Sequence, residues 1–139
     1  MKNYFNVKIS YERTDLEMKS IKRIVENFLV LSERADDVKG IIESALPGYY
    51  DNMSIEAVSK SNVGRVIKND DSGKFFKCVL VFIVENDETK ALKKVKEVFV
   101  ARVQTIEQAY TVFREDYVRG SMSECFLRSV SEMNIIDVI

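Results

Sequence analysis

The sequence predicts an α+β protein in which one structural unit is written twice. Apolar residues alternate with polar ones in several stretches, as in half-buried strands, and follow helical spacing in two others. In addition, the first half of the chain aligns with the second half. We therefore expect an internally duplicated ββαβ unit, with a mainly antiparallel sheet and two helices packed on it.

The two repeats span residues 4–67 and 75–139, and one inserted residue near position 50 keeps their hydrophobic patterns in phase. The alignment contains 11 identical pairs. These are Phe5 and Phe76, Glu17 and Glu88, Lys19 and Lys90, Lys22 and Lys93, Glu26 and Glu97, Phe28 and Phe99, Val58 and Val130, Ser59 and Ser131, Asn62 and Asn134, Val66 and Val138, and Ile67 and Ile139.

In the first repeat, alternation predicts strands near residues 5–11, 24–30 and 53–59, the first two forming a hairpin. Residues 63–67 continue the third strand or add a short one. Helical spacing over residues 35–46 predicts a helix, with Ser32 as a candidate N-cap and Pro47-Gly48 as its stop.

The second repeat has the same pattern, with strands predicted at residues 75–85, 95–102 and 124–131 and a helix at 106–118. The run Thr105-Ile106-Glu107-Gln108 has the form of a capping box. We expect eight helical residues to be buried against the sheet: Ala35, Val38, Ile42, Ala45, Ile106, Ala109, Phe113 and Tyr117.

The repeats are joined by a short polar turn at residues 68–74. Such a turn is too short to separate two domains with independent cores. We therefore expect residues 1–139 to form a single domain.

Composition excludes several classes of function. The 139 residues include 21 Lys and Arg against 22 Asp and Glu, so the net charge of −1 provides no overall attraction to nucleic acid or an anionic membrane. The absence of histidine excludes Ser-His-Asp and Cys-His catalysis and histidine metal sites. We expect no metal, no cofactor and no enzymatic activity.

The two cysteines, Cys78 and Cys125, lie in apolar stretches without metal-binding spacing, and we expect both to be buried, reduced thiols. No signal-peptide pattern or membrane-spanning apolar run is present. We therefore expect a cytoplasmic protein with no membrane partner.

The two repeats differ most in their first strands. The outward face is polar in the first repeat, whereas Val79, Val81 and Ile83 make it apolar in the second. Two alternatives follow: the chain covers this strip itself, or the strip meets another subunit or a protein partner. The second alternative predicts a homo-oligomer, most simply a homodimer.

Two further sets of residues are candidates for chemistry. Glu26 and Glu97 recur at equivalent positions, and paired carboxylates in a cleft can perform acid–base catalysis, although a structural role is favoured. Lys93, Lys94, Lys96 and Arg102 could bind phosphate groups. Because no aromatic residue interleaves with these lysines, a solvated hairpin edge protected by lysines is the favoured interpretation.

The chain resembles a family of domains of unknown function found in Bacteroidetes bacteria and their phages. The resemblance covers essentially the whole chain. It is carried by the runs at residues 7–14, 25–30, 74–83 and 129–138, the last of which reads Ser129-Val130-Ser131-Glu132-Met133-Asn134-Ile135-Ile136-Asp137-Val138. The family brings no known activity. It implies an origin in a Bacteroidetes genome, a prophage or a phage, and for a phage protein a location in the host cytoplasm, with the virion as the alternative.

Two functions remain open from the sequence. The first is a non-catalytic binding or assembly protein, plausibly encoded by a phage, that acts through protein–protein contacts. The alternative is a small phage counter-defence protein that binds a nucleotide or nucleic acid at an oligomer interface.

Overall fold

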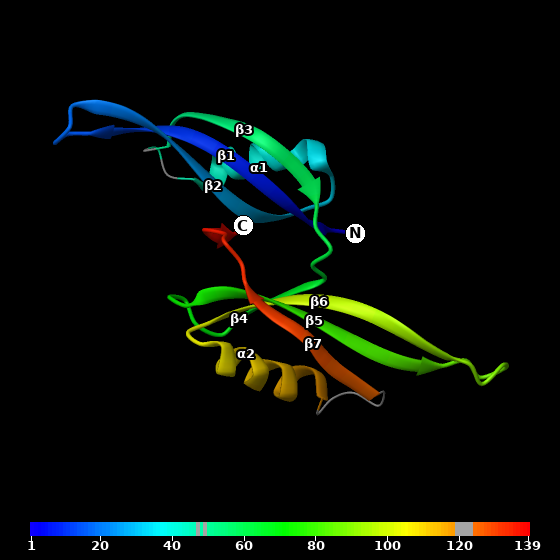
Figure 1. The fold of residues 1–139 in the computed structure, drawn as a ribbon. Coiled ribbons are helices and arrows are strands. Elements are labelled where there is room, and N and C mark those ends of the chain that lie inside the picture. The colour runs from blue at the N-terminus through cyan, green and yellow to red at the C-terminus, as the bar shows by residue number, and fades with distance from the viewer. Residues whose placement is uncertain (47, 49, 119–123) are drawn as a thin grey trace. The chain divides into compact units, whose positions relative to one another are not determined.

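The computed structural model describes residues 1–46, 48, 50–118 and 124–139 (Figure 1). The chain forms two compact units. Unit 1 contains Met1–Asn62 and Asn134–Ile139, and unit 2 contains Val63–Met133. The predicted turn at 68–74 therefore lies inside unit 2 rather than between the units.

Unit 1 is a four-stranded sheet with one helix. Its elements are β1 (Asn3–Asp15), β2 (Ser20–Ser32), a 3-10 turn (Ala35–Asp37), α1 (Val38–Ala45), β3 (Asp51–Lys60) and β8 (Asp137–Val138). The strand order is β3-β1-β2-β8. The first three strands are antiparallel, whereas β8 runs parallel to β2.

Unit 2 has the same architecture. Its elements are β4 (Arg65–Lys68), β5 (Lys74–Glu85), β6 (Leu92–Val103), α2 (Ile106–Phe113), a π-helical turn (Arg114–Val118) and β7 (Glu124–Glu132). The strand order is β4-β6-β5-β7, with β4 parallel to β6 and the other pairs antiparallel. In both units the three long strands and the helix follow the order strand, strand, helix, strand, which the short strand β4 precedes in unit 2 and the short strand β8 follows in unit 1.

Each sheet is completed by a short strand that follows, in sequence, the last long strand of the other sheet. β4 follows β3 in sequence but pairs with β6 in unit 2, and β8 follows β7 but pairs with β2 in unit 1. The pairings occupy matching places, because Val138 lies opposite Leu29 and Val66 lies opposite Val100. Residues 63–67 therefore contribute a separate short strand rather than prolonging the third strand.

Each unit has its own core between one face of the sheet and the helix. In unit 1 the helix contributes Val38 and Ile42, and in unit 2 it contributes Ala109, Val112 and Phe113. Burial of these residues follows the predicted helical stripes, and Tyr117 is partly buried against the second core. The expected burial of Ala35, Ala45 and Ile106 was wrong: all three are exposed because they lie at the ends of short helices.

Of the two predicted helix starts, the one at Thr105 was correct and the one at Ser32 was wrong. Thr105 caps α2, with its hydroxyl accepting from the backbone N–H of Gln108 at 3.3 Å. The Gln108 side chain in turn accepts from the backbone N–H of Gln104. Ser32 is not a helix cap, because it ends β2 and its hydroxyl bonds the backbone of Arg34. Pro47, half of the predicted helix stop, lies outside the described residues.

The α+β class is confirmed, and the strands are divided between two mostly antiparallel sheets instead of forming one. The internal duplication itself stays a prediction. None of the helices in the described part of the chain is long and apolar enough to cross a membrane.

Candidate functional site

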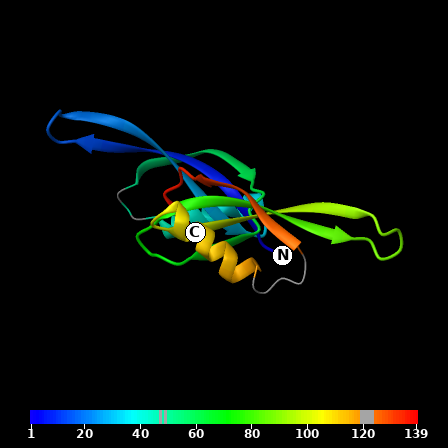
Figure 2. The same ribbon diagram turned by 60° about the horizontal axis from the view of Figure 1, so that its bottom comes forward.

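The β1–β2 hairpin ends in an exposed group of large apolar side chains. β3 pairs with β1 only as far as Glu12, so the hairpin continues beyond the three-stranded part of the sheet (Figures 1 and 2). At its end, Leu16 is 86% exposed, Met18 72% and Ile21 69%. We call residues 16–21 the hairpin end.

A side-chain hydrogen bond orders the turn of the hairpin end. The Asp15 carboxylate accepts the backbone N–H groups of Glu17 and Met18 at 3.1 and 3.2 Å. Lys19 completes the turn with a φ of 50°, in the left-handed region. The apolar side chains are therefore presented on a defined turn.

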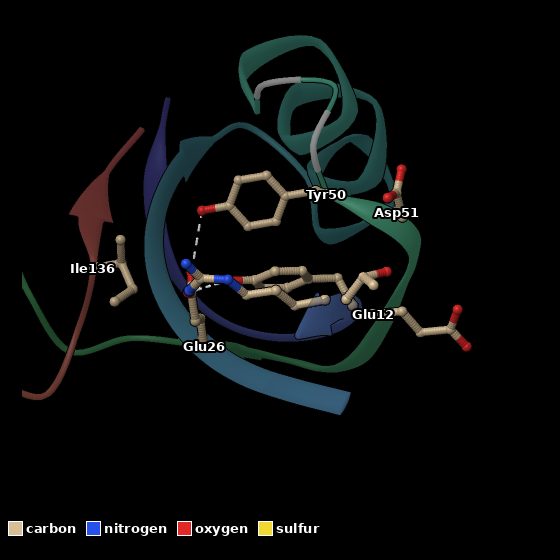
Figure 3. Close-up of a pocket in the computed structure, with 8 residues that line it drawn as sticks. Glu12, Glu26, Tyr50, Asp51 and Ile136 are labelled. Carbon is tan, nitrogen blue, oxygen red and sulfur yellow. Dashed lines mark hydrogen bonds between the residues drawn. The ribbon is translucent and has the colours of Figure 1, made fainter. Parts of the chain in front are cut away.

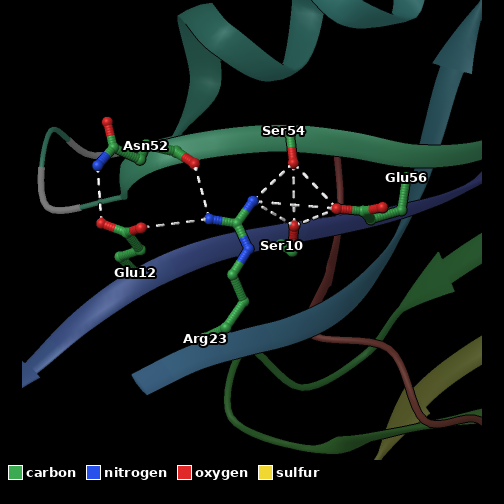
Figure 4. A network of polar contacts seen from close by, with 6 residues as sticks. All are labelled: Ser10, Glu12, Arg23, Asn52, Ser54 and Glu56. Atoms are coloured by element: carbon green, nitrogen blue, oxygen red, sulfur yellow. Dashed lines mark hydrogen bonds and ion pairs between the residues drawn. The ribbon is translucent and has the colours of Figure 1, made fainter. Parts of the chain in front are cut away.

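The outer face of unit 1 carries a polar network centred on Arg23 (Figure 4). Its Nη2 donates to the hydroxyls of Ser10 and Ser54, each at 2.8 Å, and links strands β2, β1 and β3. Its Nη1 donates to the carbonyl of Asn52 at 3.3 Å and lies 3.8 Å from a carboxylate oxygen of Glu12.

Glu56 completes this network from β3. Its carboxylate accepts hydrogen bonds from the hydroxyls of Ser10 and Ser54. These bonds lower the pKa of Glu56, Ser10 having the larger effect, and the nearby Arg23 guanidinium lowers it further. The network satisfies Ser10, which is buried, and stabilises the sheet.

In unit 2 the corresponding place is apolar. Ser10 lies opposite Ser54 in the β1–β3 pair, whereas Val81 lies opposite Phe126 in the β5–β7 pair. The predicted contrast between a polar and an apolar outward face is therefore present in the structure.

On the other face of unit 1, a pocket of about 680 Å³ surrounds Glu26 (Figure 3). The two oxygens of this carboxylate accept hydrogen bonds from the hydroxyls of Tyr11, at 2.6 Å, and Tyr50, at 3.1 Å. The two tyrosine rings lie 4.4 Å apart between centroids. Glu12 and Asp51 line the pocket but point away from Glu26. The arrangement uses the carboxylate to hold two aromatic side chains in place.

Glu26 and Glu97 belong to different units. Glu97 belongs to unit 2, is exposed, and is not among the residues that line the pocket around Glu26. In the described ranges, no group of three or more acidic or cysteine side chains is placed to hold a metal ion.

The strip formed by Val79, Val81 and Ile83 lies on β5, the strand between β6 and β7. Val81 is only 3% exposed in the single chain, and Val79 and Ile83 are partly buried. A contact between this strip and another subunit stays a prediction.

The four basic candidate residues lie along β6 without converging on one point. Lys93, Lys94 and Lys96 are exposed, and Lys93 faces the opposite side of the sheet from the other two because side chains alternate. Arg102 lies eight residues beyond Lys94, about 26 Å along a strand. Its guanidinium donates to the carbonyl of Gly73 at 3.1 Å and lies 4.9 Å from the centre of the Phe75 ring.

Both cysteines are free. Cys78 is buried, as expected, and burial raises the pKa of its thiol to about 12. Cys125 is only partly buried.

Sequence analysis did not identify the hairpin end. A signal was available, because Leu16, Met18 and Ile21 interrupt an otherwise polar run between two predicted strands, where turn residues are usually polar.

The fold and these surfaces define an α+β protein of two similar units with an exposed apolar hairpin end. The chain belongs to the family described as Domain of unknown function (DUF4494), whose sequence model matches residues 3–139. Comparison with curated proteins and with solved structures found no match.

Proposed function

We propose that this chain is a non-catalytic binding or assembly protein that makes protein–protein contacts through the hairpin end. The observation that carries the proposal is the exposure of Leu16, Met18 and Ile21, each more than two-thirds accessible. These three side chains lie within six residues of one hairpin end, and exposed groups of large apolar side chains mark interaction surfaces in soluble proteins. Burial of a Leu or Ile side chain contributes about 1.5–3 kcal/mol, so burying these side chains in an interface favours binding by several kcal/mol.

The polar groups of unit 1 support binding rather than catalysis. Both oxygens of Glu26 are occupied by tyrosine hydroxyls, and the Arg23 guanidinium is held by five neighbouring side chains or carbonyl groups. Groups held in this way fix the shape of the sheet that carries the hairpin. Because the basic residues of β6 are spread along the strand, we propose no second function in nucleotide binding.

The origin and cellular location of the protein form part of the proposal. The resemblance of residues 7–14, 25–30, 74–83 and 129–138 to proteins of Bacteroidetes and their phages supports an origin in one of these genomes. The two free cysteines support a reducing compartment such as the cytoplasm.

The test is site-specific photo-crosslinking in the cells that produce the protein. A benzophenone amino acid is placed at Met18, and Thr89, the matching position in the exposed turn of the β5–β6 hairpin, is the control. We expect protein adducts from Met18 that are absent from Thr89. Equal adduct yields at both positions would contradict the proposal.

The captured protein is then identified, purified and titrated with wild-type chain and with a Leu16→Ser/Ile21→Ser double variant. Loss of two apolar side chains is expected to weaken binding at least about tenfold. A Thr89→Ser variant is the matched control and should bind as the wild type does. Unchanged affinity of the double variant would show that the hairpin end is not the contact.

A further inference from the structure

One edge of β2 has no partner strand over residues 20–26. In the described part of the chain, β1 pairs with one edge of β2 along its whole length, whereas β8 covers the other edge only near Phe28 and Leu29. The uncovered stretch is accessible, with Ile21, Lys22, Arg23 and Val25 all exposed.

The contacts with the segment around β8 show which backbone groups point toward this edge. The carbonyls of Asn27 and Leu29 accept hydrogen bonds from Ile136 and Ile139, and the N–H of Leu31 donates to Ile139, each at 2.8 Å. Odd-numbered residues of β2 therefore point their N–H and C=O groups to the open edge. Because this direction alternates along a strand, Ile21, Arg23 and Val25 present theirs there as well.

We propose that two copies of this chain pair through this edge of β2, antiparallel and with the twofold axis at Ile24. This inference goes beyond the function proposed above, because it uses the edge of β2 and not the hairpin end. In this register, Arg23 lies opposite Val25 of the second copy and exchanges backbone hydrogen bonds with it. Lys22 lies opposite the second copy's Glu26, and the two Ile24 side chains meet at the axis.

Charge selects this register over its neighbours. An axis at Arg23 would place two guanidinium groups face to face, and an axis at Lys22 would oppose two ammonium groups. An axis at Val25 would pair Arg23 with the second copy's Asn27, whose carbonyl already bonds Ile136. The axis at Ile24 confines the pairing to residues 22–26, and its hydrogen-bonded pair, Arg23 with Val25, does not use Asn27. The axis at Ile24 gives two Lys22–Glu26 pairs and no opposed like charges.

The side chains that make this contact are available. Lys22 is 65% exposed, and its ion pair with Asp15, at 3.6 Å, is a surface contact that contributes little. Glu26 lies on the same face of β2 as Lys22 and Ile24, because side chains alternate along a strand. Each of its carboxylate oxygens accepts one hydrogen bond, from Tyr11 or Tyr50, and has room to accept a second.

The matching edge of β6 is protected against such pairing. β4 covers β6 only at residues 99–102, which leaves the stretch that begins at Leu92 open. In the equivalent register, with an axis at Val95, Lys94 would lie opposite Lys96 of the second copy, where β2 has Arg23 opposite Val25. Like charges directly opposite each other oppose pairing. The lysine cluster is therefore explained as protection of this edge, and β2 is the edge that accepts a partner.

Disulfide trapping tests the register. In the proposed dimer, the Ile24 residues of the two copies lie opposite each other as a non-hydrogen-bonded pair. The Cα atoms of such a pair are about 4.5 Å apart, which is close enough for a disulfide. In a Cys125→Ser background, Ile24→Cys should therefore form a covalent dimer under mild oxidation. Ile21→Cys is the control. In this register the residues 21 of the two copies are separated by six positions along the strand, or about 20 Å.

We expect rapid cross-linking of Ile24→Cys and little of Ile21→Cys, although residue 21 is the more exposed. Equal rates would indicate random collision, and no cross-link with Ile24→Cys would also overturn the register.

Sedimentation provides a second test that leaves the core side chain Ile24 intact. Wild type should dimerise with a dissociation constant that Lys22→Glu raises by on the order of tenfold, because two attractive pairs become repulsive. Lys93→Glu, at the matching position of β6, should have no effect. A monomeric wild type at about 100 μM, or a dimer insensitive to Lys22→Glu, would overturn edge pairing.

The photo-crosslink from Met18 reports on a different contact, because Met18 lies beyond the paired residues 22–26. A monomeric chain that captures another protein from Met18 would leave the proposed function standing and remove only the pairing of two copies.

Discussion

Lys19 and Lys90 adopt the same left-handed backbone conformation at the same place in two hairpin turns, with φ values of 50° and 59°. The turns share a second feature: Asp15 and Asn86 each accept two backbone N–H groups from the residues two and three positions later. The two hairpins therefore close with one turn geometry, although the turns share only two identical pairs, Glu17 with Glu88 and Lys19 with Lys90.

Replacement of either lysine by glycine should stabilise the protein. A left-handed residue with a Cβ atom is strained by roughly 1–2 kcal/mol, and the extra flexibility of glycine in the unfolded chain offsets part of this gain. We expect Lys19→Gly and Lys90→Gly each to raise the free energy of unfolding by about 0.5–1 kcal/mol in urea titrations. Lys→Ala variants retain the strain and should show no gain; an equal gain from alanine would refute this explanation.

Phe113 should be a major contributor to the stability of unit 2. It is 7% exposed and belongs to the core between α2 and the sheet. Phe113→Ala is expected to lower the free energy of unfolding by about 3–5 kcal/mol, measured by denaturant titration. Tyr110→Ala on the same helix is the control, because Tyr110 is 44% exposed and should cost much less. A loss below about 1 kcal/mol for Phe113→Ala would contradict the packing.

Glu56 should contribute to the pH dependence of stability. Its pKa in the folded protein lies below its ordinary value of 4.5, so its contribution is present above pH 4.5 and is lost as the pH falls through the lowered pKa. Glu56→Gln should therefore be less stable than wild type at about pH 6, and the difference should shrink toward about pH 3. Urea midpoints at the two pH values measure it, with Glu17→Gln as an exposed-carboxylate control. A difference independent of pH would contradict the role of ionised Glu56.

The two cysteines should react differently with alkylating reagents. The pKa of Cys78 is raised to about 12 by burial, so its reactive thiolate is scarce at about pH 8, and the side chain is also inaccessible. Mass spectrometry after treatment with iodoacetamide should find the label on Cys125 only. In a Cys125→Ser variant, Cys78 should be labelled only after the protein has been unfolded by denaturant. Rapid labelling of Cys78 in the folded chain would show that unit 2 opens readily.

Local patterns predicted the elements of the fold well. Alternation located the three long strands of each half, and the Thr105 capping box located the start of α2. The division into two sheets was not predicted, because the pairing of β4 with β6 and of β8 with β2 joins residues about 34 and 109 positions apart, and periodicity carries no information about such distant partners.

The candidate sites were harder to predict than the elements. Val81 and Ser10 occupy comparable strand positions, and both are buried, so residue type alone did not indicate exposure. The hairpin end was missed because Leu16, Met18 and Ile21 continue no periodic pattern. Their exposure depends on where β3 stops along β1, which is a property of the sheet and not of the local sequence.

The placement of β8 affects the order in which the units can be completed during synthesis. Unit 2 is one continuous stretch, Val63–Met133, and has all its strands once that stretch has emerged. Unit 1 needs Asn134–Ile139, which the ribosome delivers more than 70 residues after β3 ends at Lys60. At about 5–20 residues per second, this leaves roughly 4–16 seconds in which β2 has no strand on its outer edge. A nascent chain on a polysome is surrounded by identical neighbours during that interval, so residues 134–139 cover the edge of β2 at Phe28 and Leu29 only after they have been synthesised.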